Sequence, residues 1–186
     1  VIDIGMNIGL ASLFFSHMEN VYKIYGFEPF KKTFENAMTN INLNPEKYAK
    51  KIKGFNVALS DKDDEIELYY DENHSSGMSL VNRINENKNE NLEKIVLKKA
   101  SNIFSSIISE NKDCNVVCKI DCEGSEYEII NDLRINDLFN SVDLYLLEWH
   151  MGRSQEIEKS LSEEGYSYIL TQYNMCRGIC YAWKNN

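Results

Sequence analysis

Apolar residues in this chain fall into short continuous runs that alternate with segments of helical periodicity. The continuous runs are typical of parallel strands buried on both faces, and they predict strands at 1–4, 22–27, 52–59, 116–121 and 142–147. Apolar positions at helical spacing predict helices at 10–17, 31–43, 100–109 and 155–164, and a further helix beginning at 125–131. This alternation predicts an α/β fold with a mostly parallel sheet and helices on both faces.

Two segments, 65–70 and 93–98, instead alternate polar and apolar residues, as half-exposed strands do. The segment between them contains Ser79 and the polar run 82–91. We therefore predict a β insertion after the third strand, which is either a wall over the site or a solvated hairpin. The segments 166–171 and 179–183 predict a closing pair of strands, and Ser101 is a candidate N-cap for its helix.

With 186 residues, 43% of them hydrophobic, the chain is expected to form a single domain. No apolar run approaches the roughly 20 residues that span a bilayer. The net charge of -9 argues against nucleic acid or anionic lipid as a partner, and leaves a small-molecule or glycan partner. Because Val1 already lies in a strand, we expect further residues upstream, which would complete the substrate pocket.

Five cysteines, an odd number, occur in a sequence without a secretory signal, so we expect reduced thiols and a cytoplasmic protein. Cys114, Cys118 and Cys122 are spaced by four residues, but they fall on a predicted strand rather than at the turns where zinc ligands pair. Buried thiols are the favoured interpretation, and no metal is expected there.

The first turn carries the strongest chemical signal. It reads D-x-G-x-N-x-G from Asp3 to Gly9, with Gly5 and Asn7 between them. Glycines let a ligand approach the backbone, but Asn7 replaces the middle glycine of a dinucleotide fingerprint, and no lysine follows to make a P-loop. An unpaired Asp3 would be costly in an apolar strand. The turn therefore favours a cationic, phosphate-free nucleoside such as S-adenosylmethionine (SAM).

Other strand ends predict the remainder of a nucleoside site. Glu28 ends the second strand about 20 residues after the glycine turn, where an acid hydrogen-bonds a ribose diol in such sheets. An ordinary exposed glutamate is the alternative. Ala58, Ser60 and Asp61, at the end of the predicted third strand, are expected beside the adenine.

The densest polar cluster follows the fourth strand and contains Asp121, Glu123 and Glu126. Glu148 and His150 follow the fifth strand. Ligands bind outside the carboxyl ends of strands in such sheets, and crowded carboxylates raise at least one pKa. Asp121, Glu123 and His150 are the candidate bases, although His150 could equally cap its strand. A divalent metal on Asp121 and Glu123 fits chemically, but we expect none.

Four blocks of this sequence resemble the FkbM-type SAM-dependent methyltransferases: V-I-D-I-G-M-N-I-G, G-F-E-P-F, N-V-A-L-S-D and K-I-D-C-E-G-S-E-Y-E-I-I. The resemblance extends from Val1 to about His150. It implies a Rossmann-like class I fold, whose seven-stranded sheet has an antiparallel last strand. It also implies methyl transfer from SAM to an oxygen, often a hydroxyl of a sugar or another secondary metabolite.

We assign roles to individual residues as a mechanistic hypothesis. Asp3, Gly5, Asn7 and Gly9 would hold the methionine part of SAM, with Phe30 near the adenosine and Asp121 near the sulfonium. Glu126, Ser79 and Glu148 are expected on the acceptor side. Two rival classes are an NAD-dependent oxidoreductase, which Asn7 disfavours, and a non-catalytic nucleoside-binding domain, which the intact carboxylate cluster disfavours.

Overall fold

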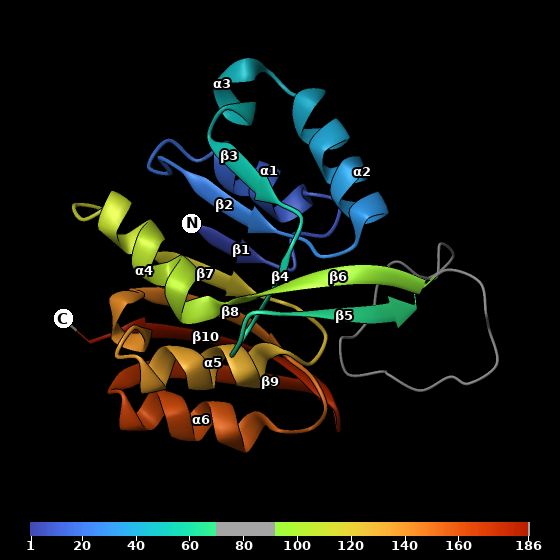
Figure 1. Cartoon of the computed structure of the whole chain (residues 1–186). Coiled ribbons are helices and arrows are strands. Elements are labelled where there is room, and N and C mark those ends of the chain that lie inside the picture. The colour runs from blue at the N-terminus through green and yellow to red at the C-terminus, as the bar shows by residue number, and fades with distance from the viewer. Residues whose placement is uncertain (70–91, 186) are drawn as a thin grey trace.

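The computed structural model describes residues 1–69 and 92–185. Its main sheet has seven strands in the order β3-β2-β1-β7-β8-β10-β9 (Figure 1). Their bounds are β1 Ile2–Ile4, β2 Ile24–Phe27, β3 Ile52–Phe55, β7 Val117–Ile120, β8 Leu144–Trp149, β9 Tyr166–Asn174 and β10 Arg177–Lys184. The strands β3, β2, β1, β7 and β8 are parallel, and β10 is antiparallel to both of its neighbours. The predicted class I methyltransferase sheet is therefore confirmed.

Helices cover both faces of this sheet (Figure 1). They are α1 Leu10–Ser16, α2 Lys31–Asn42, α3 Glu46–Ala49, α4 Ala100–Glu110, α5 Glu126–Ile135 and α6 Ser154–Glu163, with a short 3₁₀ helix, η1, at Phe139–Ser141. Phe104, Ile129 and Leu161 of α4, α5 and α6 belong to one core cluster. Ala37 and Ile41 of α2 belong to a second cluster, against which α1 and α3 also pack.

The segment predicted as one strand, 52–59, forms parts of two sheets, so that prediction is wrong. β3 ends at Phe55, and β4, Ala58–Ser60, begins a separate three-stranded sheet with β5 Asp64–Tyr69 and β6 Leu92–Lys99. Between them the Asn56 side chain donates to the backbone oxygens of Glu28 and Pro29, at 2.9 and 2.7 Å. An apolar run does not reveal its hydrogen-bonding partner, and here the partner changes within the run.

The small sheet is the predicted β insertion, and it projects past the side of the main sheet where β1, β2 and β7 end (Figure 1). It is anchored through Phe30, which packs with Ala58, Leu68, Ile95 and Leu97. Ser79 and the polar run 82–91 lie outside the described residues. The choice between a wall and a solvated hairpin therefore stays open.

The structure also corrects two local expectations. Ser101 does not cap α4, because the helix begins at Ala100, and the carboxylate that accepts from the Ser101 N–H is Asp132 of α5, at 2.6 Å. Cys118 is a buried thiol as expected, Cys122 is half-buried, and Cys180 is also buried. The exposed thiol of Cys114 contradicts the expectation of burial, and Cys176, for which no burial was predicted, is exposed as well. Both lie outside the strands, where no sheet partner covers them.

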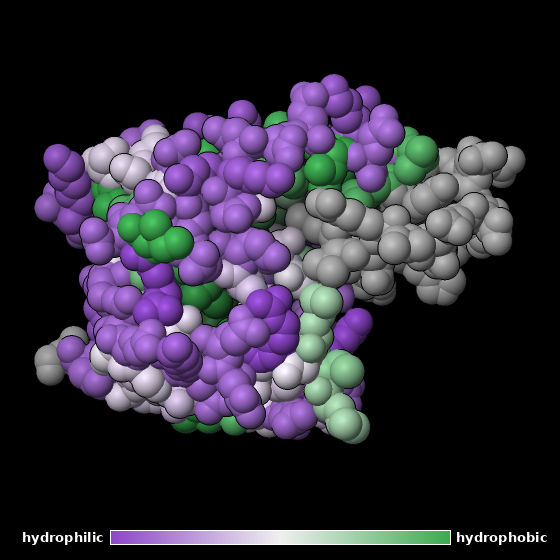
Figure 2. Space-filling model, turned by 60° about the horizontal axis from the view of Figure 1, so that its bottom comes forward, coloured by the Kyte–Doolittle hydropathy of each residue, from purple (hydrophilic) through white to green (hydrophobic). Residues whose placement is uncertain are grey.

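The drawn surface of the molecule is mostly polar (Figure 2). Hydrophilic side chains dominate the face drawn in Figure 2, and apolar side chains gather there in small, separate groups. Among the described helices, none combines the length and the apolar character that crossing a membrane requires.

Candidate active site

The two central strands of the sheet, β1 and β7, end side by side and mark the predicted ligand site. The sheet order reverses between them, since β2 and β3 follow β1 on one side while β8 follows β7 on the other. Such a switch point leaves a space outside the carboxyl ends of the strands, where ligands of open α/β sheets bind. The segments after β1, β2, β7 and β8 carry most of the predicted site residues.

The turn after β1 requires glycine for two separate reasons. Gly5, Asn7 and Gly9 all have positive φ angles, of 76°, 51° and 84°. In addition, a Cβ on Gly5 would lie 1.8 Å from the backbone oxygen of Asp121. The turn therefore packs against the loop after β7, backbone to backbone. Gly9 provides no side-chain cap for α1, so the first N–H groups of this helix have no partner from that side chain.

Asp3 precedes this turn, within β1, and is fully buried. It accepts a hydrogen bond from Ser12 at 2.6 Å and pairs with the Lys119 ammonium at 3.2 Å. Lys119 also donates to the Gly5 oxygen at 2.8 Å. The premise that Asp3 would lack a partner in its strand is therefore wrong, because β7 brings Lys119 beside it. Asp3 supports the turn through Lys119, and direct contact with a cofactor stays a prediction.

Glu28, at the end of β2, is 5% exposed. Its carboxylate accepts hydrogen bonds from the backbone N–H groups of Asn7, at 3.0 Å, and Phe30, at 3.1 Å. Burial raises the pKa of Glu28 to about 7, although these two N–H groups and the charge of Lys119 act in the opposite direction. The expectation of an ordinary exposed glutamate is excluded.

Asn7 and Glu28 together test whether a nucleoside cofactor fits this edge. The buried side-chain oxygen of Asn7 has no hydrogen-bond partner in the structure. A buried acceptor without a donor is costly, and an ammonium group of a ligand would satisfy it. The carboxylate of Glu28 is oriented by two backbone N–H groups and would accept hydrogen bonds from a diol. The residues after β1 and β2 therefore fit SAM.

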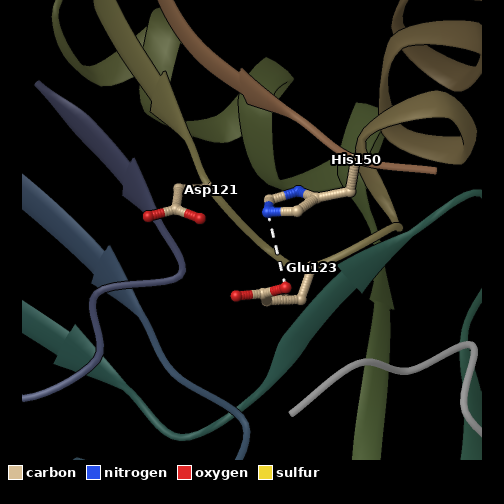
Figure 3. A group of neighbouring side chains, drawn as sticks. All are labelled: Asp121, Glu123 and His150. Atoms are coloured by element: carbon tan, nitrogen blue, oxygen red, sulfur yellow. Dashed lines mark ion pairs between the residues drawn. The ribbon is translucent and has the colours of Figure 1, made fainter. Parts of the chain in front are cut away.

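Asp121, Glu123 and His150 come together after β7 and β8, as the sequence predicted (Figure 3). One ligand atom from each of them lies within 4.8 Å of the other two. The Nε2 atom of His150 lies 3.4 Å from a Glu123 oxygen. Glu123 reaches this position through a positive φ of 54°. Such backbone strain in a non-glycine residue often occurs at functional sites.

Glu126, the first residue of α5, contacts the Nδ1 side of the His150 imidazole. The Nδ1 atom of His150 lies 2.9 Å from a Glu126 oxygen, and the Glu126 side chain is fully buried. The same oxygen accepts from the backbone N–H groups of Cys122 and Gly124. Burial disfavours the imidazolium, but the hydrogen bond to Glu126 and the charges of Glu126, Glu123 and Glu148 outweigh it and raise the pKa of His150.

Glu148 is the penultimate residue of β8, and one of its carboxylate oxygens lies 3.7 Å from the Nε2 atom of His150. Burial raises the pKa of Glu148, and the charges of Asp121 and Glu123 add to this effect while His150 opposes it. The predicted rise in a carboxylate pKa therefore occurs at this residue, with burial as its largest cause.

Two cations at this edge were not predicted. Arg177, the first residue of β10, lies 3.4 Å from a Glu123 oxygen. Lys119 lies 3.7 Å from Asp121 in addition to its contact with Asp3. The K-I-D block could have indicated Lys119, because Lys119 and Asp121 are alternate residues of the predicted strand and such residues share a face. Arg177 reaches the site only because β10 pairs with β8, and nothing in the sequence pattern indicates that pairing.

The remaining predicted residues are placed differently. Phe30 and Ala58 are buried in the core of the small sheet, and Ser60 is buried and donates to Asp61 at 3.2 Å. Asp61 itself is exposed and lines a hollow of about 360 Å³ with Tyr127 and other residues of α5 and α6. Contact between these residues and an adenosine stays a prediction. Ser79 lies outside the described residues.

The fold and the site define a class I methyltransferase domain. The sequence profile described as "Methyltransferase FkbM domain" matches residues 3–168, which is most of the chain. The chain belongs to this FkbM methyltransferase family, and the resemblance noted from the sequence is confirmed. No curated protein matches the chain at a significant level.

Solved structures support the same fold. Methyltransferase FkbM from Methylobacillus flagellatus KT is 16% identical with a TM-score of 0.60, and the match covers 98% of this chain and 42% of that one. Precorrin-6y C5,15-methyltransferase from Geobacter metallireducens GS-15 is 12% identical (TM-score 0.53, 99% and 79% covered). A human methyltransferase 10 domain containing protein is 13% identical with a TM-score of 0.54, and the match covers 98% of this chain and 70% of that one. The chain thus spans less than half of the FkbM structure that it matches.

Proposed function

We propose that this domain transfers a methyl group from SAM to a hydroxyl of a sugar, a glycan or another secondary metabolite. The observation that carries the proposal is the convergence of Asp121, Glu123 and His150 beside the Gly5–Gly9 turn. A cofactor-binding turn and a set of proton acceptors then border one space at the switch point of the sheet.

The cofactor side of the site is formed by the turn after β1 and the end of β2. Asn7 offers its unpaired oxygen to an ammonium group, and Glu28 accepts from the ribose hydroxyls. Gly5 and Gly9 keep the backbone close to the ligand, because a side chain at either position would strain the turn. SAM supplies a methyl group on a sulfonium and is a strong donor, so alignment is most of the task left to the protein.

The acceptor side must take a proton, because a neutral hydroxyl is a poor nucleophile near neutral pH. Asp121 lies against the glycine turn and is assigned to the donor end. Glu123 or His150 takes the proton, and their side chains already face each other at 3.4 Å. Glu126 orients His150 through Nδ1, so Nε2 is the nitrogen that faces the reaction. Glu148 and Arg177 border the space where the acceptor binds.

Two variants test these assignments separately. Glu28→Ala should weaken SAM binding by about tenfold or more, because the ribose loses a charge-assisted hydrogen bond. Glu123→Gln should keep SAM affinity within about twofold, yet abolish methylation of every acceptor in a panel of sugars and glycans. Isothermal titration with SAM and transfer from labelled SAM are the measurements. Glu156→Gln, an exposed acid on α6, is the control and should change neither.

Absence of a binding heat at about 1 mM SAM would refute the methyltransferase proposal, because that concentration detects even weak affinity. Unchanged SAM affinity in Glu28→Ala would remove its ribose role. Retained turnover in Glu123→Gln would assign the proton transfer to His150.

A further inference from the structure

The three side chains of Figure 3 form a donor set that metal ions use. Two carboxylates and one imidazole converge, and each of them offers an atom within 4.8 Å of the others. Metal bonds of about 2.0–2.2 Å allow ligand atoms to lie up to roughly 4.4 Å apart, so a small inward movement closes the set. Asp121 and Glu123 have partly exposed side chains, at 35% and 21%, and have room for that movement.

His150 supplies an independent observation, because it is 4% exposed and its buried Nε2 makes no hydrogen bond. Its other nitrogen, Nδ1, lies 2.9 Å from Glu126. A carboxylate on one imidazole nitrogen, with the second nitrogen directed at an ion, is the arrangement around metal-bound histidines. The buried carboxylate of Glu126 would hold the Nδ1 proton, and an ion would displace the proton that the imidazolium carries on Nε2.

The charges around the set also favour a cation. Glu126 and Glu148 add two carboxylates to those of Asp121 and Glu123. Among the described residues, the Lys119 ammonium lies 3.7 Å from Asp121 and the Arg177 guanidinium lies 3.4 Å from Glu123, and Lys119 lies closer to Asp3 than to Asp121. A carboxylate has about four acceptor positions on its two oxygens, so an ion-paired carboxylate can also bind a metal ion.

We propose that Asp121, Glu123 and His150 bind one divalent transition-metal ion, with Glu126 as the outer carboxylate that orients His150. The donor set of two carboxylates and an imidazole suits Mn²⁺, Fe²⁺ or Zn²⁺ better than Ca²⁺ or Mg²⁺, which prefer oxygen ligands alone. The catalytic part of the inference rests on the proposed function: the ion would hold the acceptor hydroxyl and lower its pKa. With Glu123 and His150 bound to the ion, Glu148, which lies 3.7 Å from the Nε2 atom of His150, would take the proton in their place.

Titration of the EDTA-treated protein with MnCl₂, without SAM or acceptor, tests the site. We expect one saturable Mn²⁺ site per chain, measured by calorimetry and by electron paramagnetic resonance. Asp121→Asn and Glu123→Gln should each weaken it by at least about tenfold, and Glu126→Gln by about 10- to 100-fold, the range measured for outer-shell partners. A ¹⁴N coupling from the imidazole should be present, and it should vanish in His150→Ala.

Two matched controls remove the same chemical groups elsewhere. Asp113→Asn removes an exposed carboxylate near the start of β7, and His17→Ala removes an exposed imidazole after α1. Both should keep Mn²⁺ affinity within about twofold of the parent chain. His150 is buried and its replacement could unfold the domain, so the more exposed Asp121→Asn and Glu123→Gln decide the result.

The absence of saturable binding up to about 1 mM Mn²⁺, or equal affinity in the parent chain, Asp121→Asn and Glu123→Gln, overturns the proposal. Because the metal titration contains no SAM, its failure is distinct from failure of the proposed function. SAM binding without Mn²⁺ binding leaves the methyltransferase proposal intact and removes the ion. Mn²⁺ binding without SAM binding keeps the site and removes its catalytic role.

Discussion

Glu28 combines burial with orientation in a way that a solvent-exposed glutamate does not. The N–H groups of Asn7 and Phe30 fix its two oxygens, while burial raises its pKa to about 7. A carboxylate accepts hydrogen bonds on both oxygens, whereas the protonated acid turns one of them into a donor. The residue therefore changes its hydrogen-bonding capacity within the physiological pH range.

SAM affinity should increase as pH rises through 7, because ionised Glu28 is the form that would accept hydrogen bonds from the ribose hydroxyls. With a pKa of about 7, the ionised fraction rises about tenfold between about pH 6 and about pH 8, and affinity should follow it. Calorimetric titration with SAM at both pH values measures this change. Glu28→Gln, which cannot ionise, should remove that dependence, and an equally steep dependence in this variant would contradict the assignment.

A hydrogen bond between Asp132 of α5 and the Ser101 N–H of α4 joins these two helices. Asp132, 4% exposed within α5, accepts from the Ser101 N–H in the first turn of α4 and lies 3.5 Å from Lys99. A negative charge beside the first N–H groups of a helix is stabilising. The start of α4 is therefore capped by a neighbouring helix rather than by its own serine.

Asp132→Ala should lower the free energy of unfolding by about 1–3 kcal/mol, because it leaves the buried Ser101 N–H without an acceptor. Ser101→Ala keeps that N–H bond and should cost clearly less. Urea unfolding of both variants measures the difference. If Ser101→Ala proved the more damaging change, the cap would be the serine hydroxyl, as the sequence alone indicated.

As a whole, the molecule places its chemistry at one edge of a seven-stranded sheet. The ends of β1 and β2 form the proposed cofactor side, the ends of β7 and β8 carry Asp121, Glu123 and His150, and the small sheet projects past this edge (Figure 1). The chain spans 42% of the FkbM structure that it matches. Because the match covers less than half of that structure, SAM binding has to be tested on this domain itself.

A ligand that binds the folded state raises its stability, by about 2.7 kcal/mol at a hundred times its Kd. Saturating SAM or S-adenosylhomocysteine should therefore raise the Tm of the domain by several degrees. NAD⁺ at the same concentration should leave it unchanged, because Asn7 stands where a dinucleotide fingerprint needs glycine. A differential scan with each ligand is the measurement. A rise with NAD⁺ alone would favour the oxidoreductase class.

Much of the fold followed from local sequence. Continuous apolar runs predicted the strands that became β1, β2, β7 and β8, since buried parallel strands lack alternation. Polar residues directly after those strands predicted that Asp121, Glu123 and His150 would meet, because parallel strands end at a common edge. The division of 52–59 between two sheets was not predictable, because hydrophobicity reports burial and not the hydrogen-bonding partner.

The sequence by itself determined the class of fold, the glycine turn and the edge at which the chemistry gathers. Only the tertiary structure decided which charges meet there. Lys119 neutralises Asp3, Glu126 holds His150, and Arg177 approaches Glu123 across 54 residues of chain. Periodicity and spacing describe neighbours within one element, whereas an ion pair depends on which elements the folded sheet places side by side.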